Sequence, residues 1–124
     1  AGAVVVFAGG LRELYPRQNS YWFDELRSKG STFVSERLWS ASCRPSDFRA
    51  RNRIVSGLSR RTYVMQASLY SGAMITARLA LDQGREVSVL AHPPGDIRGS
   101  GGAALLGEGA SAILDAGDFD LTNP

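Results

Sequence analysis

Apolar residues in this chain gather in five short runs, which are separated by longer segments of mixed character. The runs cover residues 3–8, 32–35, 62–66, 86–90 and 111–114. Runs of this length with β-branched residues are typical of β-strands. The first run, AVVVFA, contains no polar residue, and this predicts a parallel strand that is buried on both faces.

The segments between the runs have the spacing of amphipathic helices. Helices are expected over residues 19–29, 52–59, 71–83 and 102–107. Strands that alternate with helices form βαβ units around a parallel sheet. The pattern therefore predicts the α/β class, with a Rossmann-like three-layer fold and a mostly parallel sheet.

The two central helices each have an expected inward face. In the second helix the inward residues should be Ile54, Val55 and Leu58. Arg53 and Ser56 share another side of that helix. In the third helix, Ser71 is the expected N-cap and Gly84 the expected stop. The core-facing residues there should be Ile75, Leu79 and Leu81.

Length and composition are those of one soluble domain. A chain of 124 residues can bury a hydrophobic core, and no apolar run approaches the roughly 20 residues that cross a bilayer. The only cysteine, Cys43, cannot form an internal disulfide, so we expect a cytoplasmic protein. An initial Ala in place of Met indicates a processed or truncated product. Residues 115–124 hold three Asp and predict a loose, acidic C-terminal tail.

Positive charge is concentrated in one segment, although the net charge is only +2. Of 14 basic residues 13 are arginine, a bias that a GC-rich genome explains as well as phosphate binding does. Residues 44–61 hold six arginines against one acid, Asp47, and so create a local positive potential. The six are Arg44, Arg49, Arg51, Arg53, Arg60 and Arg61.

Phe48 lies among these arginines. An exposed ring there can stack on an unpaired base, so the segment predicts binding of single-stranded nucleic acid. The alternative is a solvated charged loop with Phe48 turned into the core. Arg51 and Asn52 fall at the expected start of the second helix, where free N–H groups favour phosphate. For Asn52 a plain N-cap is the alternative role.

Small residues at the start of the third helix provide a second approach for a phosphate or sugar. Ser71, Gly72 and Thr76 follow a strand and open this helix; ordinary helix capping is the alternative. In an open parallel sheet, ligands bind beyond the carboxyl ends of the strands. The segments expected to meet on that rim are Gly9-Gly10, Ser71-Gly72, residues 36–53 and residues 93–102.

Other chemistries have no matching pattern. The first strand leads into AGGLRE rather than G-x-G-x-x-G, and neither a P-loop nor a G-x-S-x-G elbow is present. His92 is the only histidine, and no set of residues has metal-ligand spacing. We therefore expect no cofactor, no metal and no catalytic residue, and His92 should be either structural or exposed on the rim. Glu36 is placed for acid–base work, but an ion pair with a neighbouring arginine is the favoured interpretation.

Four motifs resemble those of the DprA/Smf family, the DNA-processing proteins of bacterial transformation. GLRELYPRQN at residues 10–19 resembles GLDxxYPxxN, and residues 35–59 resemble SE…RP…F…RNRIIAGLS. SGAMITA at residues 71–77 resembles SGSLITA, and GREV at residues 84–87 resembles the start of GRxVFAVPG. The motifs run in family order over about residues 4–114.

The resemblance implies that residues 1–114 are part of a Rossmann-like domain that binds single-stranded DNA. It also implies protection of incoming DNA, loading of RecA, homodimerisation and no catalysis. By matching position, the implied site residues are Arg44, Phe48, Arg51, Asn52, Arg53, Ser71, Gly72 and Thr76. Arg49, Arg60 and Arg61 are expected to add positive charge.

Departures from the family pattern leave other functions open. Two βα units that begin the family's domain, with GSRxxS and SGxAxGID motifs, are missing, and this predicts a fragment or a sheet completed by oligomerisation. One alternative is a nucleotide enzyme of the phosphoribohydrolase type, although GSGGAA at residues 99–104 lacks that class's PGGxGTxxE signature. The other alternative is a degenerate half-domain that serves only protein association.

Overall fold

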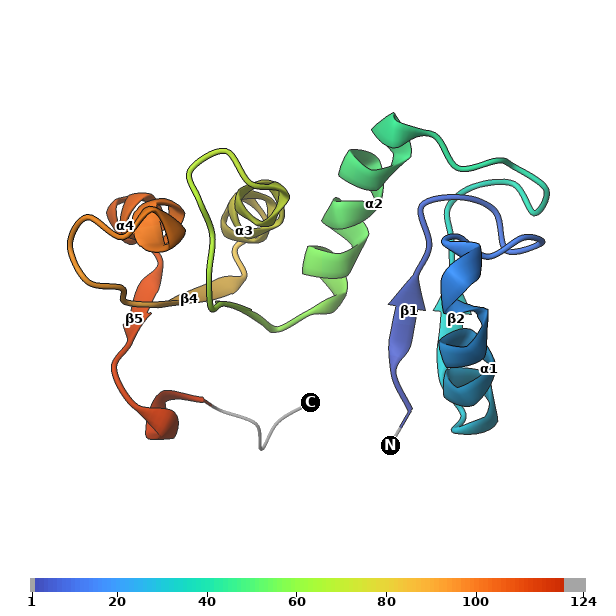
Figure 1. Ribbon diagram of the computed structural model, residues 1–124, viewed down its shortest axis with the longest axis horizontal. Helices are drawn as coiled ribbons and strands as arrows, with labels where there is room; N and C mark the ends of the chain where they lie inside the picture. Colours follow the sequence, from blue (N-terminus) through green and yellow to red (C-terminus); the bar gives the residue numbers. More distant parts are fainter. Residues whose placement is uncertain (1, 120–124) are drawn as a thin grey trace. The chain divides into compact units, whose positions relative to one another are not determined.

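The computed structural model describes residues 2–119, and the chain divides into two compact units (Figure 1). Unit 1 is Ala1–Ile54 and unit 2 is Val55–Pro124. The boundary falls within helix α2 (Pro45–Leu58). All strand pairs in both units are parallel, which confirms the predicted α/β class with parallel sheets. No helix within residues 2–119 is long and apolar enough to cross a membrane.

Unit 1 is built on the pair of strands β1 (Val4–Val6) and β2 (Thr32–Val34). A short 3-10 turn, η1 (Arg17–Asn19), leads into helix α1 (Ser20–Ser28), which lies beside these strands (Figure 1). Three phenylalanine rings fill the space between them, because Phe7 lies 5.1 Å from Phe23 and 5.3 Å from Phe33. Such aromatic pairs contribute about 0.5–1.5 kcal/mol each beyond their burial.

The first strand is less covered than its sequence predicts. Val6 is buried, but Val4 is exposed, so the expectation of a strand buried on both faces is wrong for its first half. Within the described residues β1 pairs with β2 on one edge only. An apolar run predicts that a strand can be buried, but not how much chain is present to cover it.

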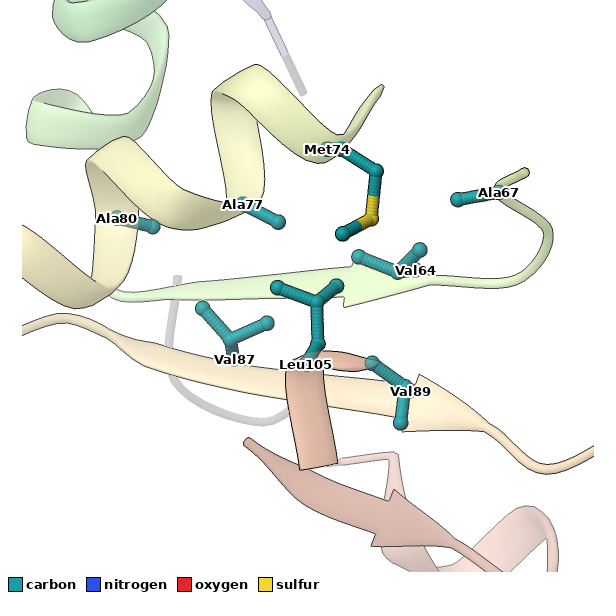
Figure 2. Close-up of a cluster of buried hydrophobic side chains, with 8 residues drawn as sticks. All are labelled: Val64, Ala67, Met74, Ala77, Ala80, Val87, Val89 and Leu105. Carbon is teal, nitrogen blue, oxygen red and sulfur yellow. The ribbon is translucent and has the colours of Figure 1, made fainter. Parts of the chain in front are cut away.

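Unit 2 contains a three-stranded sheet in the order β3 (Arg61–Val64), β4 (Glu86–Leu90), β5 (Ser111–Ile113). Helices α3 (Gly72–Asp82) and α4 (Ser100–Gly107) cover one face of this sheet, with the 3-10 turn η2 (Ile97–Gly99) before α4. Figure 2 shows the core between these layers. Its members are Val64, Ala67, Met74, Ala77, Ala80, Val87, Val89 and Leu105. Val87 and Val89 point to the same side because side chains alternate along a strand.

Helix α3 uses a different face from the one predicted. Its buried residues are Met74, Ala77 and Ala80, whereas the expected core residues Ile75, Leu79 and Leu81 are only half-buried. The helix is apolar on most sides, so its sequence does not select one stripe. Two alanines on the buried face allow the backbone to approach the sheet closely. Its predicted stop is confirmed, because Gly84 has a φ of 66°.

Helix α2 begins seven residues before the predicted start at Asn52. Pro45 is its first residue, and the Asp47 carboxylate accepts a hydrogen bond of 2.9 Å from the Arg44 N–H. Proline in the first turn and an acid at the third position are standard start signals. Asn52 is therefore inside the helix, and the expectation that it is an N-cap is wrong.

The prediction of which residues face inward at the end of α2 is also wrong. Val55 and Leu58 are 36 % and 61 % exposed, whereas Ser56 is buried. The Ser56 hydroxyl donates to the Gln83 side-chain oxygen over 2.7 Å. This hydrogen bond joins residues 27 positions apart in the sequence, so local periodicity cannot reveal that Ser56 faces inward.

The start of the expected tail is folded. Asp115 and Asp118 form a capping box around the 3-10 turn η3 (Ala116–Asp118). Phe119 then packs against Tyr63, with their ring centroids 4.9 Å apart. Residues 120–124 of the expected tail lie outside the described residues.

Candidate nucleic-acid interface

The first half of α2 carries a ring and a guanidinium one turn apart. The Arg51 Cζ lies 5.9 Å from the centroid of the Phe48 ring. Tyr15, from the loop after β1, meets the same ring edge-on at 6.0 Å. Tyr15 is 55 % and Phe48 36 % exposed. The two rings therefore form a partly open pair, and Phe48 is not enclosed in the core.

This pair lines a cleft of about 190 Å³ in unit 1, which we call the aromatic cleft. Its wall includes the end of β1 and the residues that follow it, together with Tyr15, Asn19, Cys43, Phe48 and Arg51. The cleft thus lies at the carboxyl end of β1, the place where ligands of parallel sheets bind. The expected approach of residues 36–53 to this rim is confirmed for unit 1.

Hydrogen bonds hold this rim together. The Ser35 hydroxyl donates to the Gly9 carbonyl over 2.7 Å, and the Gly10 N–H donates to the Ala41 carbonyl over 2.8 Å. The Arg51 guanidinium donates to the carbonyl of Val6, the last residue of β1. Three separate segments of unit 1 are therefore held together around the cleft.

Three of the six arginines in residues 44–61 are bound within the protein. The Arg51 guanidinium donates a hydrogen bond to the Val6 carbonyl, and the Arg51 Nε donates to the Asn52 side-chain oxygen over 3.3 Å. Arg53 forms an ion pair with Glu36, which confirms the interpretation of Glu36 as an ion-pair partner. The Arg61 guanidinium donates hydrogen bonds to Tyr63 and Glu86, and these bonds raise the pKa of the guanidinium.

The other three arginines are available to a ligand. Arg44, Arg49 and Arg60 are exposed, and within residues 2–119 their guanidinium groups form no hydrogen bond or ion pair. Arg44 and Arg49 belong to unit 1, and Arg60 belongs to unit 2. An exposed guanidinium without an acidic partner retains its charge for phosphate. The idea that Arg51 and Asn52 offer helix-start N–H groups is wrong, because both lie inside α2.

Unit 2 holds the second group of predicted residues at the start of α3. Ser71 is the N-cap, as predicted, and Gly72 begins the helix. The Ser71 hydroxyl is buried and has no hydrogen-bond partner within residues 2–119. A Cβ placed on Gly72 would meet no atom within 4 Å, so the helix start is open to a ligand, whereas Thr76 is half-buried.

The loops that follow β3 and β4 meet beside this helix start. The Ala67 N–H donates to the Arg98 carbonyl over 2.9 Å, and Gly101 N–H donates to the Ala67 carbonyl over 2.9 Å. This confirms the expected meeting of the two loops within unit 2. His92 has the expected structural environment, with Nε2 2.8 Å from the Met65 carbonyl oxygen.

Sequence reasoning missed Tyr15, which forms half of the ring pair. Its signal is the Tyr-Pro step inside the GLRELYPRQN motif. The motif indicates the family resemblance, but by itself it does not place Tyr15 in the candidate site. Within residues 2–119, no group of three or more His, Cys, Asp or Glu side chains is placed to hold a metal ion.

The sequence was compared with protein families. The model of the family named DNA recombination-mediator protein A matches residues 1–121. The chain belongs to this family. DNA processing protein DprA of Bacillus subtilis is 39 % identical over 114 residues, which are 92 % of this chain and 38 % of that protein.

Two solved structures of family members are similar in fold. DprA of Streptococcus pneumoniae matches with a TM-score of 0.80 and 30 % identity, over 95 % of this chain and 41 % of that one. DNA processing protein A of Helicobacter pylori, described for its single-stranded DNA binding mode, matches with a TM-score of 0.78 and 28 % identity. The match covers 94 % of this chain and 53 % of that one. The fold is therefore Rossmann-like, and the chain spans about two fifths to one half of these relatives.

Proposed function

We propose that this chain binds single-stranded DNA through a surface made by Tyr15, Phe48, Arg44 and Arg49. The observation that carries the proposal is the partly exposed Tyr15–Phe48 ring pair. Phe48 and the unpaired Arg49 both belong to α2, and the unpaired Arg44 directly precedes that helix. Stacking of a base on an aromatic ring contributes about 1–3 kcal/mol. Arginines along the same path neutralise the phosphates, and neither contact depends on base sequence.

The remaining site residues have different roles in this proposal. Arg51 and Arg53 position the helix through Val6 and Glu36 rather than neutralising phosphate. Ser71 and Gly72 offer an open helix start in unit 2, where a phosphate can accept hydrogen bonds. Arg60 adds positive charge, whereas the charge of Arg61 is already paired with Glu86.

The biological role proposed is that of the family. The protein acts on incoming single-stranded DNA during transformation, protects it, helps RecA to load, and performs no catalysis itself. Support comes from the family match and from the relative described for single-stranded DNA binding. Dimerisation belongs to the same proposal, as does the cytoplasm as the site of action.

Fluorescence anisotropy with labelled oligo-dT at several salt concentrations tests the binding step, with the Helicobacter pylori protein as a positive control. The logarithm of the association constant should fall linearly with the logarithm of salt, by about 0.7 per neutralised phosphate. The double variant Arg44→Gln/Arg49→Gln should lower this slope by about 1.4.

Arg53→Gln is the matched control. It removes one positive charge from the same helix, but that charge is already paired with Glu36, so the slope should stay near that of the unchanged chain. If the chain does not bind oligo-dT at low salt, the proposal is wrong.

The RecA step needs its own experiment. The rate of RecA filament growth on single-stranded DNA is measured with and without this protein. Faster growth is expected, and it should disappear with the double arginine variant. Equal rates would remove RecA loading from the proposal while leaving DNA binding in place.

A further inference from the structure

We propose that a second pocket of unit 1 binds a phosphate group of the same DNA strand; this inference rests on the single-stranded DNA binding proposed above. The pocket has a volume of about 320 Å³. We call it the Arg12 pocket. The polar side chains on its wall include Arg12, Glu13, Tyr15, Arg17, Ser40 and Ser42.

The wall of the Arg12 pocket is a fixed part of the fold. The Arg12 N–H donates to the Trp39 carbonyl over 3.0 Å, and Gly10 N–H donates to the Ala41 carbonyl over 2.8 Å. A Cβ on Gly10 would collide with the carbonyl oxygen of Leu38, so only glycine permits this approach. The loop after β1 and the segment after β2 are thus held against each other and enclose the pocket.

The charges on the wall leave one free cation. Arg17 and Glu13 form an ion pair of 2.5 Å and neutralise each other. Arg12 is exposed, and its guanidinium has no hydrogen bond or ion pair within residues 2–119. Its planar fork is suited to two oxygens of one phosphate.

Ser40 and Ser42 add hydroxyl donors to the same pocket. They flank Ala41, whose carbonyl and N–H are both bonded, to Gly10 and Leu38 respectively. Two hydroxyls on a fixed backbone and one free guanidinium on the same pocket wall match a tetrahedral anion. An apolar or cationic ligand would leave the Arg12 guanidinium without an acceptor.

The Arg12 pocket lies next to the aromatic cleft. Tyr15 and Cys43 line both spaces, so the two share a wall. A base stacked in the aromatic cleft keeps its sugar and phosphate outside the ring pair. The next phosphate along the strand can then lie against Arg12. This shared wall favours a nucleic-acid phosphate over an unrelated anion.

The test measures the salt slope of oligo-dT binding for Arg12→Gln, Arg12→Lys and Lys29→Gln. Arg12→Gln should lower the slope by about 0.7, the loss of one phosphate contact, whereas Arg12→Lys retains the charge and should keep the slope. Lys29→Gln removes a charge that is paired with Glu25 and lies on neither wall, so its slope should match the unchanged chain. Circular dichroism confirms that each variant is folded.

Each variant is measured on oligo-dT with and without a 5′-phosphate. A lower slope with both oligonucleotides supports binding of a backbone phosphate, and a lower slope only with the phosphorylated one supports binding of a terminal phosphate. If Arg12→Gln has the slope of Lys29→Gln on both, the inference is overturned. If the unchanged chain does not bind at all, the proposed function fails instead.

Discussion

Unit 1 and unit 2 bury different kinds of side chain, and unit 1 exposes more aromatic rings than unit 2, in which Tyr70 is exposed. The core of unit 2 is aliphatic, and Met74, Val89 and Leu105 are almost completely enclosed. Unit 1 packs three phenylalanine rings and leaves Tyr15, Tyr21 and other aromatic residues exposed. Tight aliphatic packing stabilises a fold but offers nothing to a polar ligand. We therefore expect substitutions in the core of unit 2 to act mainly on stability, and substitutions at the ring pair of unit 1 to act mainly on the proposed DNA binding.

The largest expected effect is on stability, from a cavity in the core of unit 2. Leu105→Ala should lower the free energy of unfolding by about 2–5 kcal/mol, because Leu105 is completely buried between α4 and the sheet. Its neighbour Leu106 is 39 % exposed, and Leu106→Ala should cost less than about 1 kcal/mol. Urea unfolding measures both. Equal losses would show that the burial of α4 is wrongly assigned.

A glycine in α4 tests how tightly the same core is packed. A Cβ on Gly101 would lie 2.6 Å from the Met74 sulfur and 2.8 Å from the Ala67 carbonyl oxygen. Gly101→Ala should therefore destabilise the protein by about 1–3 kcal/mol. At Gly107 a Cβ meets no atom within 4 Å, so Gly107→Ala should stabilise by about 0.5 kcal/mol. The melting temperature should fall for Gly101→Ala and rise for Gly107→Ala. A higher melting temperature for Gly101→Ala would contradict the close contact.

In unit 1, the largest effect on DNA affinity is expected from the Tyr15–Phe48 ring pair. Phe48→Ala should weaken oligo-dT binding by about 1–3 kcal/mol through the lost stacking. Trp22→Ala is the matched control, because Trp22 is an exposed ring on α1 that lines neither pocket of the proposed path. Its affinity should stay unchanged. If both variants lose affinity equally, recognition in unit 1 is not centred on Phe48.

The smallest effect is the dependence of stability on pH. A side-chain hydrogen bond from Arg98, and then its backbone N–H, hold the pKa of Asp96 well below the ordinary value of 3.8. A carboxyl group with a lowered folded-state pKa stabilises the fold above its unfolded-state pKa, and this contribution is lost as the pH falls further. Unfolding should thus become easier below about pH 4. Asp96→Asn should flatten this dependence, and an unchanged slope in acid would contradict the contact.

Short-range patterns were enough to predict most of the fold. The strand β4 was predicted with its observed bounds, and the stop at Gly84 follows from its place after an apolar helix. The start of α2 was not predicted, although Pro45 and Asp47 are its start signals, because PSDFRAR at residues 45–51 has no apolar stripe of helical spacing. The core face of α3 was missed because several of its stripes are apolar. These choices depend on packing that lies far away in the sequence.

The sequence predicted which segment carries the candidate site, but not the role of each residue within it. Clustering of charge identified the arginines, but it does not distinguish one that is free, such as Arg49, from one that is bound, such as Arg53. Glu36 lies 17 residues from Arg53, and Val6 lies 45 residues from Arg51. Tyr15 reaches Phe48 only through the folded chain. Such pairings arise from tertiary structure and are not visible in composition.

The most direct measurement is the mapping of oligo-dT onto the chain by NMR chemical-shift changes. The largest chemical-shift changes should occur at Tyr15, Phe48 and Arg49, with smaller ones along the Arg12 pocket. Backbone signals of α4, beneath which the core of unit 2 lies, should stay in place. Changes confined to the outer side of α1, at Tyr21 and Trp22, or an absence of any change at saturating oligo-dT, would contradict the account.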